Sequence, residues 1–123
     1  MKQSTQSAGI EWDFLNQEVM ELSRAGSYGH AVVVAQKALE VAEQNVGPDH
    51  PATATSLDNL ANLYKAQNRY AKAEPLYERA LAIREKAFGL DHPDVLTSLE
   101  HLAKFYYSQG DHNKAQPLYR RFG

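Results

Sequence analysis

The sequence lacks several features that would point to particular classes of protein. It has no cysteine in 123 residues, which excludes disulfide frameworks, thiolate zinc sites and cysteine nucleophiles. Its 13 Lys and Arg residues do not outnumber its 15 Asp and Glu residues, so we expect no nucleic-acid partner. No run reaches about 18 apolar residues, so we expect no membrane span. The polar first residues lack the apolar stretch of a signal peptide, which favours a cytoplasmic protein.

What the sequence does contain is an internal repeat of 42 residues. The segment GPDHP at 47–51 returns as GLDHP at 89–93, and 89 − 47 = 42. The same offset aligns Thr55-Ser56-Leu57 with Thr97-Ser98-Leu99, Leu60-Ala61 with Leu102-Ala103, and Pro75-Leu76-Tyr77 with Pro117-Leu118-Tyr119. A looser copy precedes them, because Tyr28 and Ala31 match Tyr70 and Ala73. Agreement at so many fixed positions indicates a repeat architecture.

The repeat divides the chain into three units. We expect a flexible segment at 1–9, a divergent repeat at 10–46, a second repeat at 47–88 and a third at 89–123. A full third unit would run to about 130, so the last helix is expected to be cut at Gly123. We interpret the chain as a slice of a longer array.

Each unit has the apolar spacing of two helices. Leu57, Leu60, Ala61 and Tyr64 follow the pattern i, i+3, i+4, i+7 of an amphipathic helix, and a second stripe begins at Tyr70. The short turns within and after the pairs carry residues suited to a left-handed backbone conformation: Gly26, Gly47, Asn68, Gly89 and Gly110. We therefore predict an all-α fold of about three helix-turn-helix repeats.

Four prolines add detail to this prediction. Pro51 and Pro93 are placed to open the first helix of their units. Pro75 and Pro117 fall inside the second helices, about five residues after the turn, so we expect a bend or a tightened first turn there.

The pattern of small and aromatic residues resembles the tetratricopeptide repeat, in the 42-residue form of kinesin light chains. The second unit carries it at Ala61, Tyr64, Tyr70, Ala73, Tyr77 and Ala80; the third at Ala103, Tyr106, His112, Ala115, Tyr119 and Phe122; the first at Val19, Leu22, Tyr28, Ala31, Ala35 and Ala38. The resemblance covers roughly residues 10 to 122. It implies a right-handed α-α superhelix whose concave face is lined by the first helix of each pair and binds extended peptides.

Metal, cofactor and enzyme signatures are weak or missing. His50 and His92 lie in equivalent loops about 10 Å apart by helix-packing distances, too far to share one metal ion, so we expect loops that use Asp49 and Asp91 for local hydrogen bonds. No phosphate loop, dinucleotide fingerprint or nucleophile elbow occurs. We expect no metal, no cofactor and no catalysis.

The polar stripe of each first helix is the better candidate site. If the apolar stripe faces inward, the concave side carries Gln17, Met20, Arg24, Asn59, Asn62, Lys65, His101, Lys104 and Tyr107. The resemblance assigns Asn59 the task of gripping a peptide backbone. The family's clamp for chaperone tails is not matched, because Asn59 is the only residue of that set present.

The charges of the expected groove form two rows. Asp13, Asp58 and Glu100 lie in one row, and Arg24, Lys65 and Lys104 in the other. A ligand with an acidic segment beside an apolar anchor would suit the basic row and Met20 or Tyr107. We therefore predict a scaffold that binds a peptide of a partner protein. The alternative is a structural module whose open C-terminal end stacks on another copy as a homodimer. An enzyme and a nucleic-acid binder are less favoured.

Overall fold

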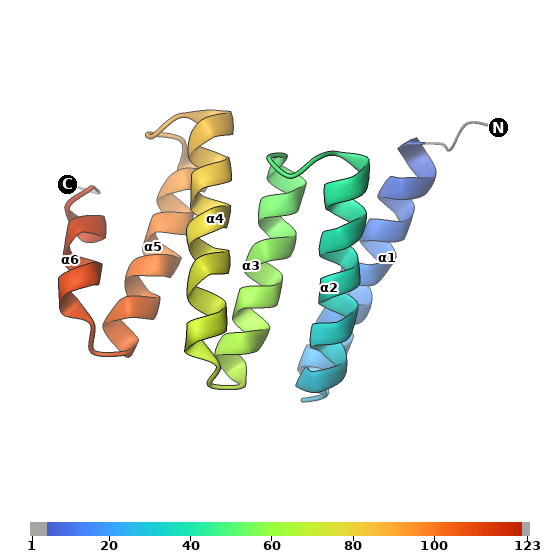
Figure 1. The fold of residues 1–123 in the computed structure, drawn as a ribbon, viewed down its shortest axis with the longest axis horizontal. Helices are drawn as coiled ribbons and strands as arrows, with labels where there is room; N and C mark the ends of the chain where they lie inside the picture. Colours follow the sequence, from blue (N-terminus) through green and yellow to red (C-terminus); the bar gives the residue numbers. More distant parts are fainter. Residues whose placement is uncertain (1–4, 122–123) are drawn as a thin grey trace.

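The computed structural model describes residues 5–121, with side chains from residue 9 onward. These residues form six helices and no strand: α1 (Thr5–Arg24), α2 (Tyr28–Asn45), α3 (Pro51–Ala66), α4 (Tyr70–Phe88), α5 (Pro93–Ser108) and α6 (His112–Arg120). Each helix packs on the next in chain order, and Figure 1 shows two layers, with α2 and α4 in front of α1 and α3. The predicted all-α fold of three helix-turn-helix units is confirmed.

The turns have the backbone conformations that the sequence predicts. Asn68 is the one non-glycine residue with a positive φ in the described part of the chain, at 62°, and Gly110 occupies the matching turn at 80°. Asn and Gly are the residues that tolerate this left-handed region best. The turn therefore closes α3 and α5 in the same way.

The loops that open α3 and α5 are capped by histidine. The Nδ1 atom of His50 accepts a hydrogen bond from the backbone N–H of Ala52 at 3.0 Å, and His92 does the same for Asp94 at 3.1 Å. Pro51 and Pro93 begin the helices as predicted. The expectation that Asp49 would supply the local bonds is wrong: its carboxylate pairs with Lys86 at 3.3 Å.

The ends of the repeats differ in part from the sequence prediction. Helix α1 begins at Thr5, so residues 5–9 of the segment that we expected to be flexible belong to this helix. Residues 1–4, Phe122 and Gly123 lie outside the described part.

Both internal prolines are accommodated within their helices. Pro75 lies inside α4 and Pro117 inside α6. In α4 the carbonyl of Arg69 accepts from Lys72 and from Ala73, both at 3.2 Å. A bond across three residues is the mark of a tightened, 3₁₀-like turn. The carbonyls of His50 and His92 accept the same pair of bonds at the starts of α3 and α5, where no proline follows inside the helix, so the expected bend or tightened turn at Pro75 and Pro117 stays a prediction.

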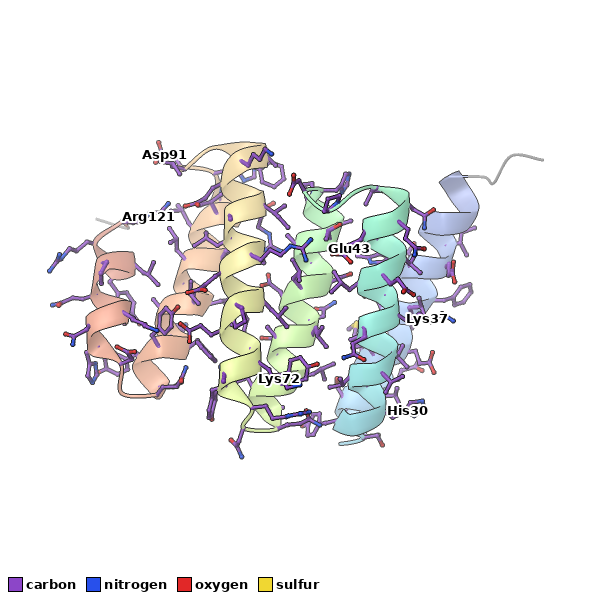
Figure 2. All side chains as sticks on the ribbon, in the orientation of Figure 1. His30, Lys37, Glu43, Lys72, Asp91 and Arg121 are labelled. Carbon is purple, nitrogen blue, oxygen red and sulfur yellow. The ribbon has the colours of Figure 1, made fainter. Side chains whose placement is uncertain are left out.

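Small buried residues let the two layers pack closely, and repeated ion pairs link neighbouring helices within one layer. Ala31, Ala73 and Ala115 in the second helices and Ala61 and Ala103 in the first are all at most 1% exposed, so the backbones approach closely. On the outer layer Arg79 pairs with Glu43 at 2.9 Å, and 42 residues later Arg121 pairs with Glu85 at 2.5 Å. Figure 2 shows Glu43 and Arg121 toward the same end of their helices. Each second helix is thereby tied to the next.

Candidate functional site

A hollow between α1 and α3 gathers four of the nine predicted site residues. It has a volume of about 350 Å³ and is lined by Val19, Met20, Ser23, Arg24, Tyr28, Asn59, Asn62, Leu63 and Ala66. We call it the α1–α3 hollow. Met20, Arg24, Asn59 and Asn62 meet here because the polar stripes of the two helices lie next to each other.

The α1–α3 hollow combines an apolar base with polar groups. Val19 and Leu63 are buried beneath it, whereas Met20 is 50% exposed. The Asn59 amide donates to Asn16 Oδ1 over a long 3.4 Å, and Asn62 Oδ1 accepts from the Tyr77 hydroxyl. The oxygen of Asn62 is thus held by α4, and its amide group can still donate hydrogen bonds.

A second hollow of about 300 Å³ lies between α3 and α5. It is lined mostly by polar and charged residues, with two apolar ones: Pro51, Thr55, Asp58, Arg84, Phe88, Asp94, Thr97, Ser98 and His101. We call it the α3–α5 hollow. Of the predicted site residues, His101 lies here, one unit away from Asn59.

A half-buried ion pair lines the α3–α5 hollow. Arg84 Nη1 of α4 donates to Asp58 Oδ2 at 2.5 Å and to Ser98 Oγ at 2.6 Å, which connects three helices. The two charged side chains are only 13% and 17% exposed. Burial raises the pKa of the Asp58 carboxyl, and the charge and hydrogen bond of Arg84 partly offset this rise.

The remaining predicted residues are not gathered in these two hollows. Tyr107 lines a separate hollow between α5 and α6. Gln17 donates to Glu21 at 3.2 Å, and Lys104 pairs with Glu100 at 3.1 Å along the same helix. Lys65 is exposed on α3.

The two predicted rows of charge are altered by these pairings. Lys104 and Glu100, from opposite rows, neutralise each other, and Asp58 is neutralised by Arg84. Arg24 remains at the rim of the α1–α3 hollow, where it is exposed. Lys65 of the same predicted row is also exposed, on α3, so the positive charge of that row remains at Arg24 and Lys65.

Sequence reasoning missed Arg84 and Phe88, which reach the α3–α5 hollow from the other layer. Arg84 falls on a stripe with Tyr77, Leu81 and Phe88 at i, i+4, i+7 and i+11, which packs against neighbouring helices. A cation on a packed stripe needs a partner from another helix. An arginine on an otherwise apolar helix stripe was therefore the feature of the sequence that could have identified Arg84.

Neither a metal centre nor a membrane span is found in the described residues. Among residues 9–121 no three His, Asp or Glu side chains are grouped so that they could hold a metal ion. Between residues 5 and 121, no helix has the length and apolar character needed to cross a bilayer.

The chain is similar to known repeat proteins in sequence. The model of the tetratricopeptide repeat family matches residues 22–86 and again 67–121. Nephrocystin-3 of Homo sapiens is 49% identical over 56 residues, and that of Xenopus laevis is 48% identical over the same length. The match covers 46% of this chain but only 4% of each relative, so the chain spans a small part of these proteins.

Solved structures show the same fold. BtubC (BKLC) from P. vanneervenii superposes with a TM-score of 0.82 and 26% identity, over 98% of this chain and 46% of that one. A putative kinesin light chain with nearly identical TPR-like repeats from Podosopora anserina gives 0.76 and 22%, over 98% and 55%. The arrangement of helices is therefore that of a repeat superhelix.

Proposed function

Because this chain belongs to the tetratricopeptide repeat family, we propose that it is a protein–protein interaction scaffold that binds an extended segment of a partner protein. The proposed binding surface is the face of α1, α3 and α5. One observation carries the proposal: the α1–α3 hollow brings together Met20, Arg24, Asn59 and Asn62, which the sequence predicts as binding residues.

The chemistry of the α1–α3 hollow suits an extended peptide. A peptide backbone presents both donors and acceptors, and the side-chain amides of Asn59 and Asn62 can serve such groups. An apolar side chain would pack between Met20 and Val19 and lose contact with water. An acidic residue beside that anchor would meet Arg24 at the rim.

We expect no catalytic activity, no cofactor and no nucleic-acid partner for this scaffold. The cytoplasmic location inferred from the N-terminal sequence stays a prediction.

Substitution on the proposed face tests the proposal. We expect the double variant Asn59→Ala/Lys104→Glu to lose partner binding without unfolding, and Arg24→Glu to weaken it. The partner is first captured from the native source with the wild-type chain, and its affinity is then measured by calorimetry. Lys37→Glu reverses a charge on α2 in the other layer, where Figure 2 shows Lys37, and is the matched control. Unchanged affinity in the double variant would refute the assigned face.

The alternative, self-association through the C-terminal end, is separated from peptide binding by its concentration dependence. Light scattering of the chain alone between micromolar and millimolar concentration reports it directly. A monomer over this range favours the scaffold, and a dimer favours the alternative.

A further inference from the structure

The two asparagines of the α1–α3 hollow are held in different ways. Asn59 donates to Asn16 Oδ1 over a long 3.4 Å, and both residues belong to first helices. Asn62 is instead bonded from the other layer, because its Oδ1 accepts from the hydroxyl of Tyr77 on α4. Asn62 is exposed, and the last side-chain torsion of an exposed asparagine is loosely restrained on its own. The bond from Tyr77 therefore selects one of the orientations open to this amide.

Tyr77 gives this bond a rigid support. Its side chain is only 4% exposed, and its ring centroid lies 5.1 Å from that of the fully buried Phe105. Burial, together with the nearby charge of Asp58, raises the pKa of the Tyr77 hydroxyl above its usual value. The hydroxyl therefore keeps its proton at neutral pH and acts as a donor, which a buried tyrosine normally pairs with an acceptor.

The same bond determines what Asn62 can offer to a ligand. Asn62 lines the α1–α3 hollow, and its amide group carries an acceptor oxygen and a nitrogen with two N–H donors. The oxygen is held by Tyr77, which reaches it from α4. Asn62 therefore meets a ligand in the hollow through its N–H groups. The backbone carbonyl oxygen of an extended peptide is a matching acceptor.

The pairing of an asparagine with a tyrosine occurs in the second unit alone among the three. The positions 42 residues away carry other combinations: Met20 with Ala35 in the first unit and Lys104 with Tyr119 in the third. Neither combination can form a bond between an amide oxygen and a hydroxyl. The two helices nevertheless pack on each other in all three units. The packing of a unit therefore does not require this bond.

We propose that Tyr77 is a positioning residue of the α1–α3 hollow, whose hydroxyl fixes Asn62 as a hydrogen-bond donor to a backbone carbonyl oxygen of the bound segment. This inference rests on the peptide-binding function proposed above and adds to it the residue that orients one of the binding groups. Tyr77 touches no ligand and acts from the other layer through Asn62. The hollow is thus prepared for its ligand by a helix that does not line it.

A peptide probe and a double-mutant cycle test the proposal. The probe is a heptapeptide selected from a random phage-displayed library because it binds the wild-type chain and not Arg24→Glu. Calorimetry should show binding about two- to tenfold weaker for Tyr77→Phe, because the released amide has to be ordered again on binding. In a chain that also carries Asn62→Ala, Tyr77→Phe should cause no further loss. An equal loss with and without the Asn62 amide would show that Tyr77 only supports packing, and would overturn the proposal.

Single variants supply the controls, and circular dichroism verifies that each is folded. Asn62→Asp retains an acceptor for Tyr77 but has no N–H donor, so its binding should be at least about tenfold weaker. Tyr119→Phe removes the equivalent hydroxyl of the third unit and should bind the peptide as the wild type does. If Asn59→Ala/Lys104→Glu kept full affinity, the assigned face and this proposal would both be refuted. If it lost the peptide while Tyr77→Phe and Asn62→Asp bound normally, the face would stand and the role of Tyr77 would be wrong.

Discussion

The ion pair between Arg84 and Asp58 allows a quantitative test of how the third unit is joined to the second. Arg84 bonds both Asp58 on α3 and Ser98 on α5, so its removal affects three helices at once. The first junction provides the natural comparison, because Ala42 and Asn16 stand 42 residues before Arg84 and Asp58. The double variant Arg84→Ala/Asp58→Asn therefore gives the second junction the residues of the first.

The expected magnitudes follow from burial. Removing one partner of a fully buried pair costs about 3–5 kcal/mol, and the 13% and 17% exposure of these side chains reduces this figure. We expect Arg84→Ala to lower the free energy of unfolding by about 2–3 kcal/mol and Asp58→Asn by about 1 kcal/mol. The double variant should lose only about 1–2 kcal/mol, because no carboxylate is left unpaired. Urea unfolding followed by circular dichroism measures all four chains.

The pH dependence gives an independent readout of the same pair. Burial raises the folded-state pKa of Asp58 above its unfolded value, and Arg84 opposes that rise. Without Arg84 the pKa rises further, so the ionised carboxylate destabilises the fold at neutral pH. This cost disappears as the pH falls through the raised pKa, because the carboxyl becomes neutral. The loss of unfolding free energy caused by Arg84→Ala should therefore become smaller as the pH falls. In a chain that also carries Asp58→Asn, this loss should not depend on pH. The reasoning would be refuted if the losses of the two single variants added up to that of the double variant at pH 7, or if the loss caused by Arg84→Ala grew as the pH fell.

Three further sets of substitutions test local features. Gly110→Ala should lower the free energy of unfolding by about 1 kcal/mol, because the φ of Gly110 is 80°. Gly29→Ala should raise it, because Gly29 lies inside α2 and has equally open space around it. If thermal unfolding shifted the melting temperature of both variants in the same direction, this explanation would be contradicted. His50→Ala should lower the free energy of unfolding by about 0.5–2 kcal/mol. His50→Asn should lower it much less, because asparagine also caps a helix. Equal losses for the two variants in urea unfolding would exclude the capping role. Trp12→Phe removes the 2.7 Å bond from Nε1 to Ser56 and should cost about 1–2 kcal/mol, part of which Ser56→Ala should restore in the same assay.

Most of the fold could be predicted because it depends on local patterns. Helix periodicity, the left-handed turn residues and the first-turn prolines are each legible within a few residues, and the structure places all three where expected. The histidine caps were missed although a signal was present. A proline at the first helical position identifies the residue before it as the cap, and that residue is His50 or His92.

The candidate site was harder to predict because it depends on contacts between helices. The sequence indicated which residues lie on the polar stripe of each first helix, but not that six of them divide among three hollows while Gln17, Lys65 and Lys104 lie outside these. The sequence-based prediction also counted Asp58 among the exposed acidic residues of the groove. Its partner Arg84 comes from a helix of the other layer, 26 residues away, and only the packing of α4 against α3 and α5 brings the two together. One helix read alone cannot reveal such a pairing.

The two junctions show how a similar packing of helices can carry different surfaces. Ser56 and Ser98, 42 residues apart, each accept a hydrogen bond from the preceding unit, but the donor is Trp12 Nε1 in one case and Arg84 Nη1 in the other. Where Ala42 stands, the first junction keeps an apolar hollow beside Trp12 and Val46. Where Arg84 stands 42 residues later, the equivalent space is polar and holds the ion pair. Because the serine needs a donor rather than a particular residue, the backbone can repeat while the neighbouring hollows differ. The character of each hollow is thus set by side chains that the repeat pattern leaves free to vary.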